Sequence, residues 1–481
     1  MFVCFGNHMA YSQDKPYPGF YDQLNTRLKE DSTSKIKVSA IIISGNKKTK
    51  NYIILREMLI KEGDSLIASR LYNSIEQSRN LVYNTNLFSE VEIQPVLNTA
   101  YSLTLHVIVK ERWYIFPLPQ FKLVDRNLNE WLKDYNGSLE RVIYGGKFTH
   151  YNFSGRGDQL RIFLLSGYAR TLSFSYTAPY SNPSLTEGFS ISGGFTQSKE
   201  FPYQTSKNNK LLQFKKDGFV RDAFSFGATY RLRRGYFRRH LFSASYNYIN
   251  VHDSVLTARY NPNYFADGKS KVSFPEFSYT FQYINTDNIN YPLKGKIFAV
   301  QASKRGLGLS GGLNMFGIDA AYRKYYTHRK NFYSAIELYT KLKLPFKQPY
   351  YNQRAMGYTD LYLRGLEYYV IDGVSASIAK YTLSKKLVSF KIPVPFKIKA
   401  LPYVPFSIFA KTYADAGYAY NRPQYNAAQN LSYISNLNNR FLYTGGFGLD
   451  ILTLYDFSFK IEYSFNQLGE KGLFLHAKGG F

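Results

Sequence analysis

The chain has 481 residues, and its 45 Tyr and 38 Phe raise the aromatic share to 18%, a surplus that suits membrane strands with aromatic girdles. A mean hydropathy of −0.33, and the lack of any apolar run near the roughly 20 residues of a spanning helix, argue against a helical membrane protein. The net charge of +27 is dispersed along the chain without a nucleic-acid-binding motif, so no nucleic-acid partner is predicted.

The N-terminal residues predict no folded element. Residues 1–12 contain a short apolar stretch with small residues near Ala10, but they lack the basic start and the continuous apolar core of a signal peptide. We interpret them as a truncated or misassigned secretion signal, the alternative being an ordinary flexible terminus. Residues 13–34 are polar and contain two prolines, and they predict a linker.

Order is predicted to start after this linker, in a small domain over residues 35–112. A β-branched strand ends at the Gly45-Asn46 turn, and Thr49 stands where it could cap a helix that Gly63 ends. A second helical pattern and two strands follow, which gives the order β-α-α-β-β. The five predicted elements are a strand at 36–44, helices near 49–62 and 71–82, and strands at 91–93 and 103–109.

From residue 113 to 481 the pattern changes to alternating strands separated by polar turns, and no helix is predicted. In residues 455–466 the odd positions are apolar and the even positions are polar, so one face is expected to meet lipid and the other water. A soluble sandwich also alternates, but its strands are mostly about 5 or 6 residues long. The pattern therefore favours a transmembrane antiparallel β-barrel.

The densest basic run lies between two of these strand patterns. Arg231, Arg233, Arg234, Arg238 and Arg239 are interrupted only by Leu232 and by Gly235-Tyr236-Phe237, which predicts a hairpin turn. Two interpretations stay open for its charges: a solvated turn, or contact with lipid phosphates at the membrane surface.

The small domain resembles the polypeptide-transport-associated (POTRA) family. The matching residues stand in the order and spacing of that family, and they include Gly45, Asn46, Gly63, Asp64 and Phe88. The resemblance implies a periplasmic domain that takes an extended client segment onto a sheet edge. The alternative is a spacer domain that binds nothing.

The strand region resembles the barrel of the BamA/TamA-type outer-membrane superfamily, and this resemblance implies sixteen strands. Gly146 with residues 151–158 is similar to an early barrel hairpin, and Asp287-Asn288 with residues 291–295 is similar to a later strand-turn boundary. Arg156-Gly157-Asp158 also spells an adhesive tripeptide, but a turn that needs glycine explains it better.

Leu363-Arg364-Gly365 is similar to the tip of the long sixth extracellular loop of this superfamily. The resemblance implies that the loop folds into the barrel lumen, where Asp415 of an Asp-x-Gly element ending at Gly417 holds the arginine. A buried guanidinium needs an anionic partner, so Arg364 and Asp415 form a reasoned pair. A second acid expected near residue 380 is replaced by lysine here. The alternative is an exposed loop arginine.

The last strand resembles the C-terminal β-signal of outer-membrane barrels and ends at the aromatic Phe481. Gly479 and Gly480 reduce side-chain packing and would weaken pairing with the first barrel strand. The resemblance then implies a lateral seam that opens to template incoming strands. The alternative is that the two glycines merely fit a turn.

The resemblance implies a factor that assembles outer-membrane proteins or translocates a client, with the single POTRA domain favouring an accessory paralogue. The expected partners are outer-membrane lipid including lipopolysaccharide, an unfolded or secreted client, and possible accessory lipoproteins. The alternative is a transport pore of the two-partner-secretion type, or a lipid or passenger export barrel. An enzyme is not supported, because no catalytic arrangement is distinguishable. One cysteine and scattered histidines predict neither a metal nor a cofactor.

Overall fold

The computed structural model describes residues 33–99, 101–123, 138–308, 313–394, 403–426 and 431–479. The predicted signal segment, nearly all of the predicted linker, Gly480 and Phe481 therefore lie outside the described residues. Within the described ranges, neither α-helix is long and apolar enough to cross a membrane.

The N-terminal domain packs two helices on a four-stranded mixed sheet whose strand order is β2-β1-β4-β3. Strands β1 and β4 pair in parallel, and the other two pairings are antiparallel. The elements are β1 (Lys35–Ser44), α2 (Asn51–Glu57), β2 (Ser65–Ile67), α3 (Ala68–Tyr83), β3 (Phe88–Thr99) and β4 (Ser102–Glu111).

The core of this domain follows from two periodicities. Leu71, Ile75 and Val82 recur at helical spacing on α3 and are buried, while Leu103 and Leu105 alternate along β4 and are fully buried. The helix therefore covers one face of the sheet.

The structure corrects three details of the predicted domain. Helix α2 ends at Glu57 and not at Gly63, because the chain turns inward after Glu57 to bury Met58 and Ile60. Thr49 does not cap this helix, because its hydroxyl contacts Tyr114 and accepts a hydrogen bond from Asn152. Strand β2 was not predicted, since its three residues are too few to show a period.

The rest of the chain forms a 16-stranded antiparallel sheet, as the resemblance implied. Its strands pair with their neighbours in the order β26-β25-β24-β21-β20-β17-β16-β15-β14-β13-β12-β9-β8-β7-β6-β5. They are β5 (Ile115–Leu123), β6 (Val142–Tyr151), β7 (Gln159–Gly167), β8 (Ala169–Ala178), β9 (Glu187–Ser198), β12 (Arg221–Arg234), β13 (Arg238–Val251), β14 (Lys271–Thr286), β15 (Gly295–Arg305), β16 (Met315–Arg329), β17 (Phe332–Leu344), β20 (Ser375–Pro393), β21 (Tyr403–Tyr420), β24 (Phe441–Leu452), β25 (Ser458–Asn466) and β26 (Lys471–Lys478).

The loops between these strands contain shorter elements. Three two-stranded ribbons pair β10 with β11, β18 with β19 and β22 with β23, and the helical turns are all of the 3₁₀ type. The ribbons are β10 (Glu200–Thr205), β11 (Leu211–Lys215), β18 (Arg354–Met356), β19 (Ile371–Asp372), β22 (Gln424–Asn426) and β23 (Leu431–Tyr433). The 3₁₀ turns are η1 (Leu139–Arg141), η2 (Asp253–Leu256), η3 (Ala266–Gly268), η4 (Tyr350–Asn352) and η5 (Leu454–Asp456).

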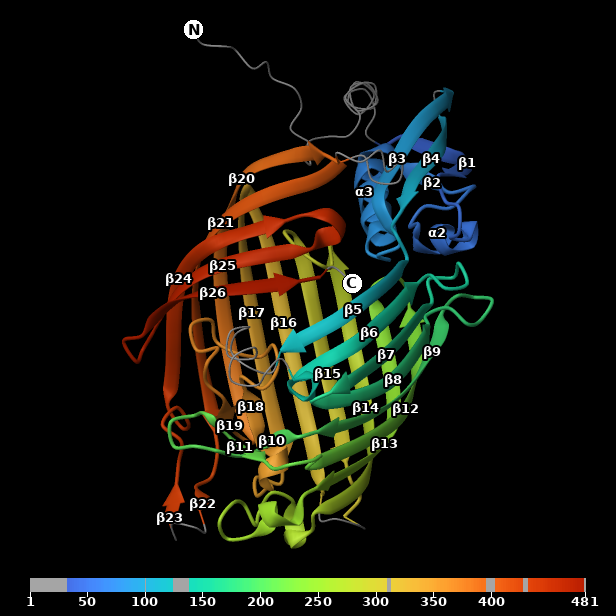
Figure 1. Cartoon of the computed structure of the whole chain (residues 1–481). Helices are drawn as coiled ribbons and strands as arrows, with labels where there is room; N and C mark the ends of the chain where they lie inside the picture. The colour runs from blue at the N-terminus through green and yellow to red at the C-terminus, as the bar shows by residue number, and fades with distance from the viewer. Residues whose placement is uncertain are drawn as a thin grey trace.

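The sheet curls into a barrel, with the N-terminal domain at one end and the longer loops at the other (Figure 1). Alternate residues face out: Phe224, Phe226 and Tyr230 of β12 are exposed aromatics on the outer wall. One predicted strand starts later than its pattern, because residues 454–456 form η5 and β25 begins at Ser458. Asp456 is buried there, for a reason given below.

Candidate functional site

The loop between β17 and β20, residues 345–374, brings Arg364 into the barrel. The Arg364 Nε donates to Asp415 Oδ2 of β21 at 2.9 Å, a second guanidinium nitrogen donates to Asp415 Oδ1, and the Arg364 backbone N–H donates to Oδ2 at 3.0 Å. The two side chains are 11% and 0% exposed. The structure thus brings the two predicted residues together as a buried fork-to-carboxylate pair.

The remaining guanidinium contacts replace the acid that was expected near residue 380. The other terminal nitrogen of Arg364 donates to the Thr382 hydroxyl at 2.9 Å, and the guanidinium lies 4.0 Å from the centre of the Tyr413 ring. A hydroxyl and an aromatic face can hold a guanidinium without a second carboxylate.

The neighbouring predicted residues fit closely around this pair. Leu363 is buried, and a Cβ on Gly417 would lie 3.1 Å from its methyl carbon. Gly365 has φ of +92°, and a Cβ there would lie 2.9 Å from the Cβ of Ser464 on β25. Glycine at 365 is therefore required both by the backbone and by the approach of the loop to the wall.

A second charged group ties the loop to the last strands, and the sequence patterns did not identify it. Lys411 Nζ lies 2.5 Å from both Glu462 Oε1 and Asp450 Oδ1. His476 Nε2 of β26 lies 3.3 Å from Glu462 Oε2 and 3.6 Å from Glu367 Oε1 of the loop. Inward polar positions on β21, β24, β25 and β26 were the one signal, and they do not reveal which residues meet.

The end of the barrel away from the N-terminal domain is covered by packed loops. Tyr264, Phe265 and Tyr350 are buried in one cluster with Phe201 and Leu313, from four different loops. Buried polar contacts reinforce it, such as the Thr205 hydroxyl donating to Asp372 Oδ1 at 3.1 Å. The loops thus form a cap with its own core.

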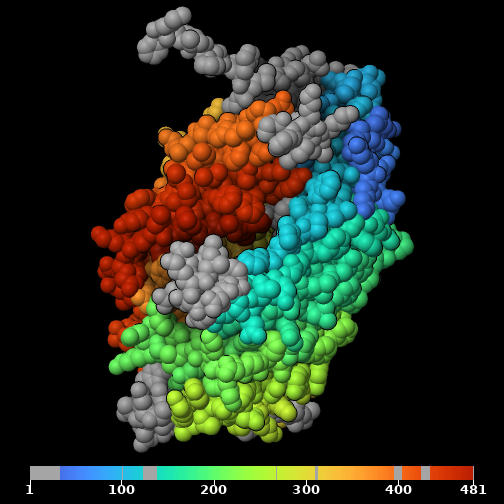
Figure 2. Space-filling model, in the orientation of Figure 1, coloured from blue at the N-terminus to red at the C-terminus, as the bar shows by residue number. Residues whose placement is uncertain are grey.

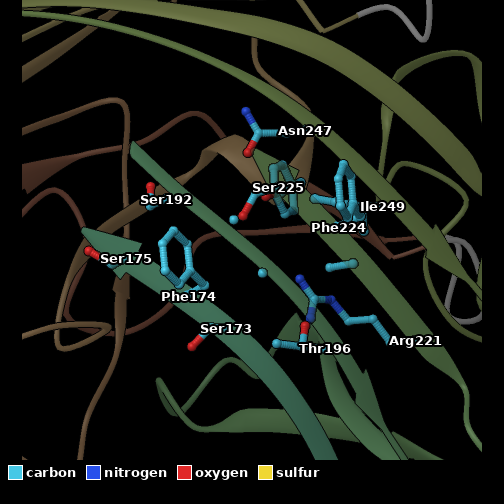
Figure 3. Close-up of a pocket in the computed structure, with 14 residues that line it drawn as sticks. Ser173, Phe174, Ser175, Ser192, Thr196, Arg221, Phe224, Ser225, Asn247 and Ile249 are labelled. Carbon is cyan, nitrogen blue, oxygen red and sulfur yellow. The ribbon is translucent and has the colours of Figure 1, made fainter. Parts of the chain in front are cut away.

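A cavity of about 430 Å³ lies along the wall of β8, β9, β12 and β13. Its polar lining comes from small hydroxyl and amide side chains, including Ser173, Ser175, Ser192 and Asn247, with Arg221 at one side (Figure 3). This wall differs from the charged wall of β21 to β26 that holds the loop.

The N-terminal domain is docked on the barrel through a buried ion pair. Two guanidinium nitrogens of Arg233 donate to the Glu57 carboxylate at 2.5 and 2.6 Å, and the Tyr180 hydroxyl donates to the same carboxylate at 2.6 Å. The basic run forms the predicted hairpin between β12 and β13: its arginines lie in the paired strand ends, and residues 235–237 make the turn. For Arg233, however, both interpretations were wrong, because a carboxylate of the docked domain binds it.

A second buried ion pair joins the junction between the two domains to η5. Arg112 donates to Asp456 Oδ2 at 2.8 Å, and this aspartate also accepts from Tyr83, Asn288 and Asn290. The Asn290 amide further donates to Asn86 Oδ1 at 2.8 Å. These partners explain why Asp456 is buried and why the chain leaves the strand pattern there.

A third contact comes from the turn between β6 and β7. The Lys50 N–H donates to Gly155 O at 3.0 Å, and the Asn152 amide donates to the Thr49 hydroxyl at 2.9 Å. Asp158 is buried and accepts from Ser154 and Tyr176 within the barrel. The Arg-Gly-Asp tripeptide therefore contributes to a packed turn, which supports the turn interpretation.

The residues of the POTRA-like signature occupy structural positions. Gly45 has φ of +89°, and a Cβ there would lie 1.9 Å from the Val109 carbonyl oxygen. The Asn46 amide donates to Thr49 O at 2.8 Å, and Asp64 Oδ2 accepts from Lys61 N at 2.8 Å. Gly63 lies in a turn with φ of +86°, and Phe88 is fully buried.

The two edge strands of the sheet are β5 and β26, and the predicted seam would lie between them. Within the described ranges no strand pairs with the outer edge of either one. In the space-filling view a hollow separates the red last strands from the cyan first strands (Figure 2). Gly479 is exposed directly after β26, while Gly480 and Phe481 lie outside the described residues.

Comparisons with known proteins identify the N-terminal domain and find relatives of part of the chain. Residues 36–112 match the POTRA family model, described as a surface antigen variable number repeat. The outer membrane protein assembly factor BamA of Neorickettsia risticii (strain Illinois) is 29% identical over 208 residues, covering 43% of this chain and 25% of that protein. BamA of Nitratidesulfovibrio vulgaris is 25% identical over 182 residues, covering 36% and 20%. The matched region thus spans about a quarter or less of these relatives, which are named as assembly factors.

Two solved structures cover most of the chain. BamA from Haemophilus ducreyi lacking POTRA domains 1–3 aligns with a TM-score of 0.48 and 16% identity, over 92% of this chain and 84% of that one. CdiB from Escherichia coli aligns with a TM-score of 0.47 and 12% identity, over 95% and 97%.

Proposed function

We propose that this chain, which carries a POTRA domain ahead of its β-barrel and is similar to BamA relatives, belongs to the BamA/TamA-type superfamily and inserts outer-membrane proteins or translocates a client across the outer membrane. It lies in the bacterial outer membrane with the POTRA domain in the periplasm. The proposed work is non-covalent, with no catalytic residue. The client is an unfolded outer-membrane protein or a secreted protein.

The luminal loop carries this proposal. A client that crossed the lumen would have to displace the buried Arg364–Asp415 pair and the packed cap beyond it. The outer edge of β26, in contrast, presents backbone N–H and C=O groups that can pair with an incoming strand, whereas Pro117 and Pro119 remove two donors from β5. These observations favour insertion at the seam over passage through an open pore. Contact with lipopolysaccharide and with accessory lipoproteins is part of the same proposal.

Reconstitution in liposomes tests the proposal. The rate at which an added unfolded outer-membrane barrel folds is measured by protease protection and by heat-modifiable gel mobility. We expect the chain to accelerate folding and Arg364→Ala to remove most of this acceleration, because the neutral side chain leaves Asp415 buried without its partner.

The matched control is Arg259→Ala, since Arg259 is an exposed loop arginine whose described contact is the ring of Tyr260. This variant should accelerate folding like the parent chain. Both variant barrels must themselves show native gel mobility. If the parent chain gave no acceleration but conducted ions or exported a passenger, the transport alternative would replace the assembly proposal.

A further inference from the structure

The β20–β21 hairpin is longer than the strands beside it. Pairing between its two strands continues to Pro393 and Tyr403, whereas β17 pairs with β20 only as far as Lys385 and β24 pairs with β21 only from Ser407. Residues 387–393 of β20 extend beyond β17, and residues 403–406 of β21 extend beyond β24; together they are called the hairpin extension. Seven residues at roughly 3.3 Å each give the free β20 edge a length of about 23 Å.

The hairpin extension lies at the periplasmic end of the barrel. The Lys386 N–H donates to Asn331 O in the turn between β16 and β17 at 2.8 Å, so the rim of the wall is level with this residue. Beyond it, β20 and β21 bend across the end of the barrel toward the N-terminal domain (Figure 1). The extension therefore projects past the wall that lipid covers.

Apolar side chains cover this extension although no described element packs over them. Five of its residues are between 42% and 54% exposed: Leu387, Val388, Phe390, Ile392 and Tyr403. Phe390 and Phe406 stack across the hairpin with ring centres 5.5 Å apart. A two-stranded ribbon is marginally stable in water, and exposed apolar area favours a partner that removes it from water.

The two outer edges of the extension are not equivalent. Pro405 lies on the β21 edge and cannot donate to an added strand. Residues 387–392 of β20 include no proline, so the alternate N–H groups that point away from β21 remain available to an added strand. Within the described ranges β21 is the one strand that pairs with this stretch of β20. Strand addition is therefore favoured on the β20 edge.

The positive charge of this region favours a partner with acidic side chains. Among the described residues of 381–410 there is no Asp or Glu, and the charged side chains are those of Lys385, Lys386 and Lys391. We propose that the outer edge of β20 over residues 387–392 binds an extended client segment of alternating apolar and acidic residues, which adds as a β-strand. This docking site rests on the proposed function and names where the client first pairs. A lipid headgroup would not pair with the backbone groups of the edge.

Site-specific photo-crosslinking in the full-length chain in liposomes tests this site. A photoreactive phenylalanine is placed at Phe390, and at Phe226 on the outer wall of β12 as the control. The probes are an unfolded outer-membrane barrel and a peptide that alternates Phe with Asp. We expect at least about tenfold more crosslinked client from position 390, and competition by this peptide but not by its Phe-Lys counterpart. Equal crosslinking at the two positions, or a product at 390 made only with phospholipid, overturns the proposal.

The double variant Phe390→Ser/Ile392→Ser separates this inference from the proposed function. We expect it to slow client folding at least about fivefold, with Leu307→Ser on an exposed loop as the control. If the parent chain accelerates folding and the double variant does so equally, the docking site is wrong while the assembly function stands. If the parent chain fails to accelerate folding, the assembly function falls, and crosslinking at 390 still decides whether the site binds a strand. The crosslinking experiment replaces Phe390 by a phenylalanine analogue and leaves Ile392 unchanged. It therefore still tests the docking site if the double variant misfolds.

Discussion

Buried ion pairs hold the luminal loop and the POTRA domain against the barrel. Arg364 fixes the luminal loop through Asp415, and Arg233 fixes the POTRA domain through Glu57, with both acids almost fully buried. In each pair one residue belongs to a loop or domain and the other to the barrel. Because a buried charge that loses its partner is costly, each pair specifies one docked position.

The Glu57 pair predicts a dependence of docking on pH. Burial alone raises the pKa of the Glu57 carboxyl, but the charge of Arg233 and hydrogen bonds from Arg233 and Tyr180 outweigh burial and hold the pKa below its ordinary value of 4.5. The pair therefore stabilises docking fully above about pH 4.5, and this contribution is lost as pH falls through the lower folded value. Glu57→Gln should weaken the docked state by about 3–5 kcal/mol at neutral pH.

Distances between spin labels check this prediction. Labels at Tyr101 on the POTRA domain and Asn331 on the barrel rim, in a Cys4→Ser background, should give one narrow distance distribution at pH 7. Glu57→Gln should broaden it, while Glu76→Gln, which changes an exposed acid on α3, should not. A distribution that stays narrow in Glu57→Gln would show that the other turns are sufficient for docking.

At the scale of elements, strands and motifs were predictable from the sequence. The contacts between side chains of different strands and loops were not. Alternation in β12 and β13 and the turn residues of 287–295 gave strands where the structure has them. Arg364 and Asp415 were paired through the resemblance. Lys411, Glu462 and His476 were missed, because a two-residue period identifies the inward face but not which strands lie opposite a loop. Arg233 was misread, because a hairpin turn looks solvated until another domain covers it.

The position of the luminal loop requires glycine at residue 365, and this requirement can be tested. Gly365→Ala places a Cβ 2.9 Å from the Cβ of Ser464 and forces alanine into φ of +92°. We therefore expect the loop to detach from the barrel wall and client folding to slow. Gly469→Ala is the matched control, since its φ is +77° but nothing lies within 4 Å of the added Cβ. Protease cleavage of residues 345–374 should rise in Gly365→Ala only. Equal cleavage in both variants would mean that backbone strain, and not the approach to β25, explains the glycine.

Across the whole molecule, the POTRA domain is fastened to several turns at the periplasmic end of the barrel. The contacts come from the end of β12 and from the turns after β6, β8, β12, β14 and β24. A hydrogen bond contributes about 1 kcal/mol net, and one to a charged group about 1.5–3 kcal/mol. Their sum, several kcal/mol, keeps the domain docked more than about 99% of the time. Under the proposed function, we therefore expect the client to be handled with the POTRA domain in place.

Crosslinking the domain to the barrel tests this view of the whole molecule. The amide of Asn290 lies 2.8 Å from Asn86 Oδ1, so cysteines at these two positions, in a Cys4→Ser background, should react almost completely with a short bismaleimide. Because the docked state already predominates, we expect the crosslinked chain to fold its client at the rate of the unreacted one. Cysteines at Glu76 and Asn331, where no contact is found in the described chain, should crosslink poorly. A large loss of activity on crosslinking Asn86 to Asn290 would mean that undocking belongs to the working cycle, and that the buried pairs of Glu57 and Asp456 break and re-form with each client.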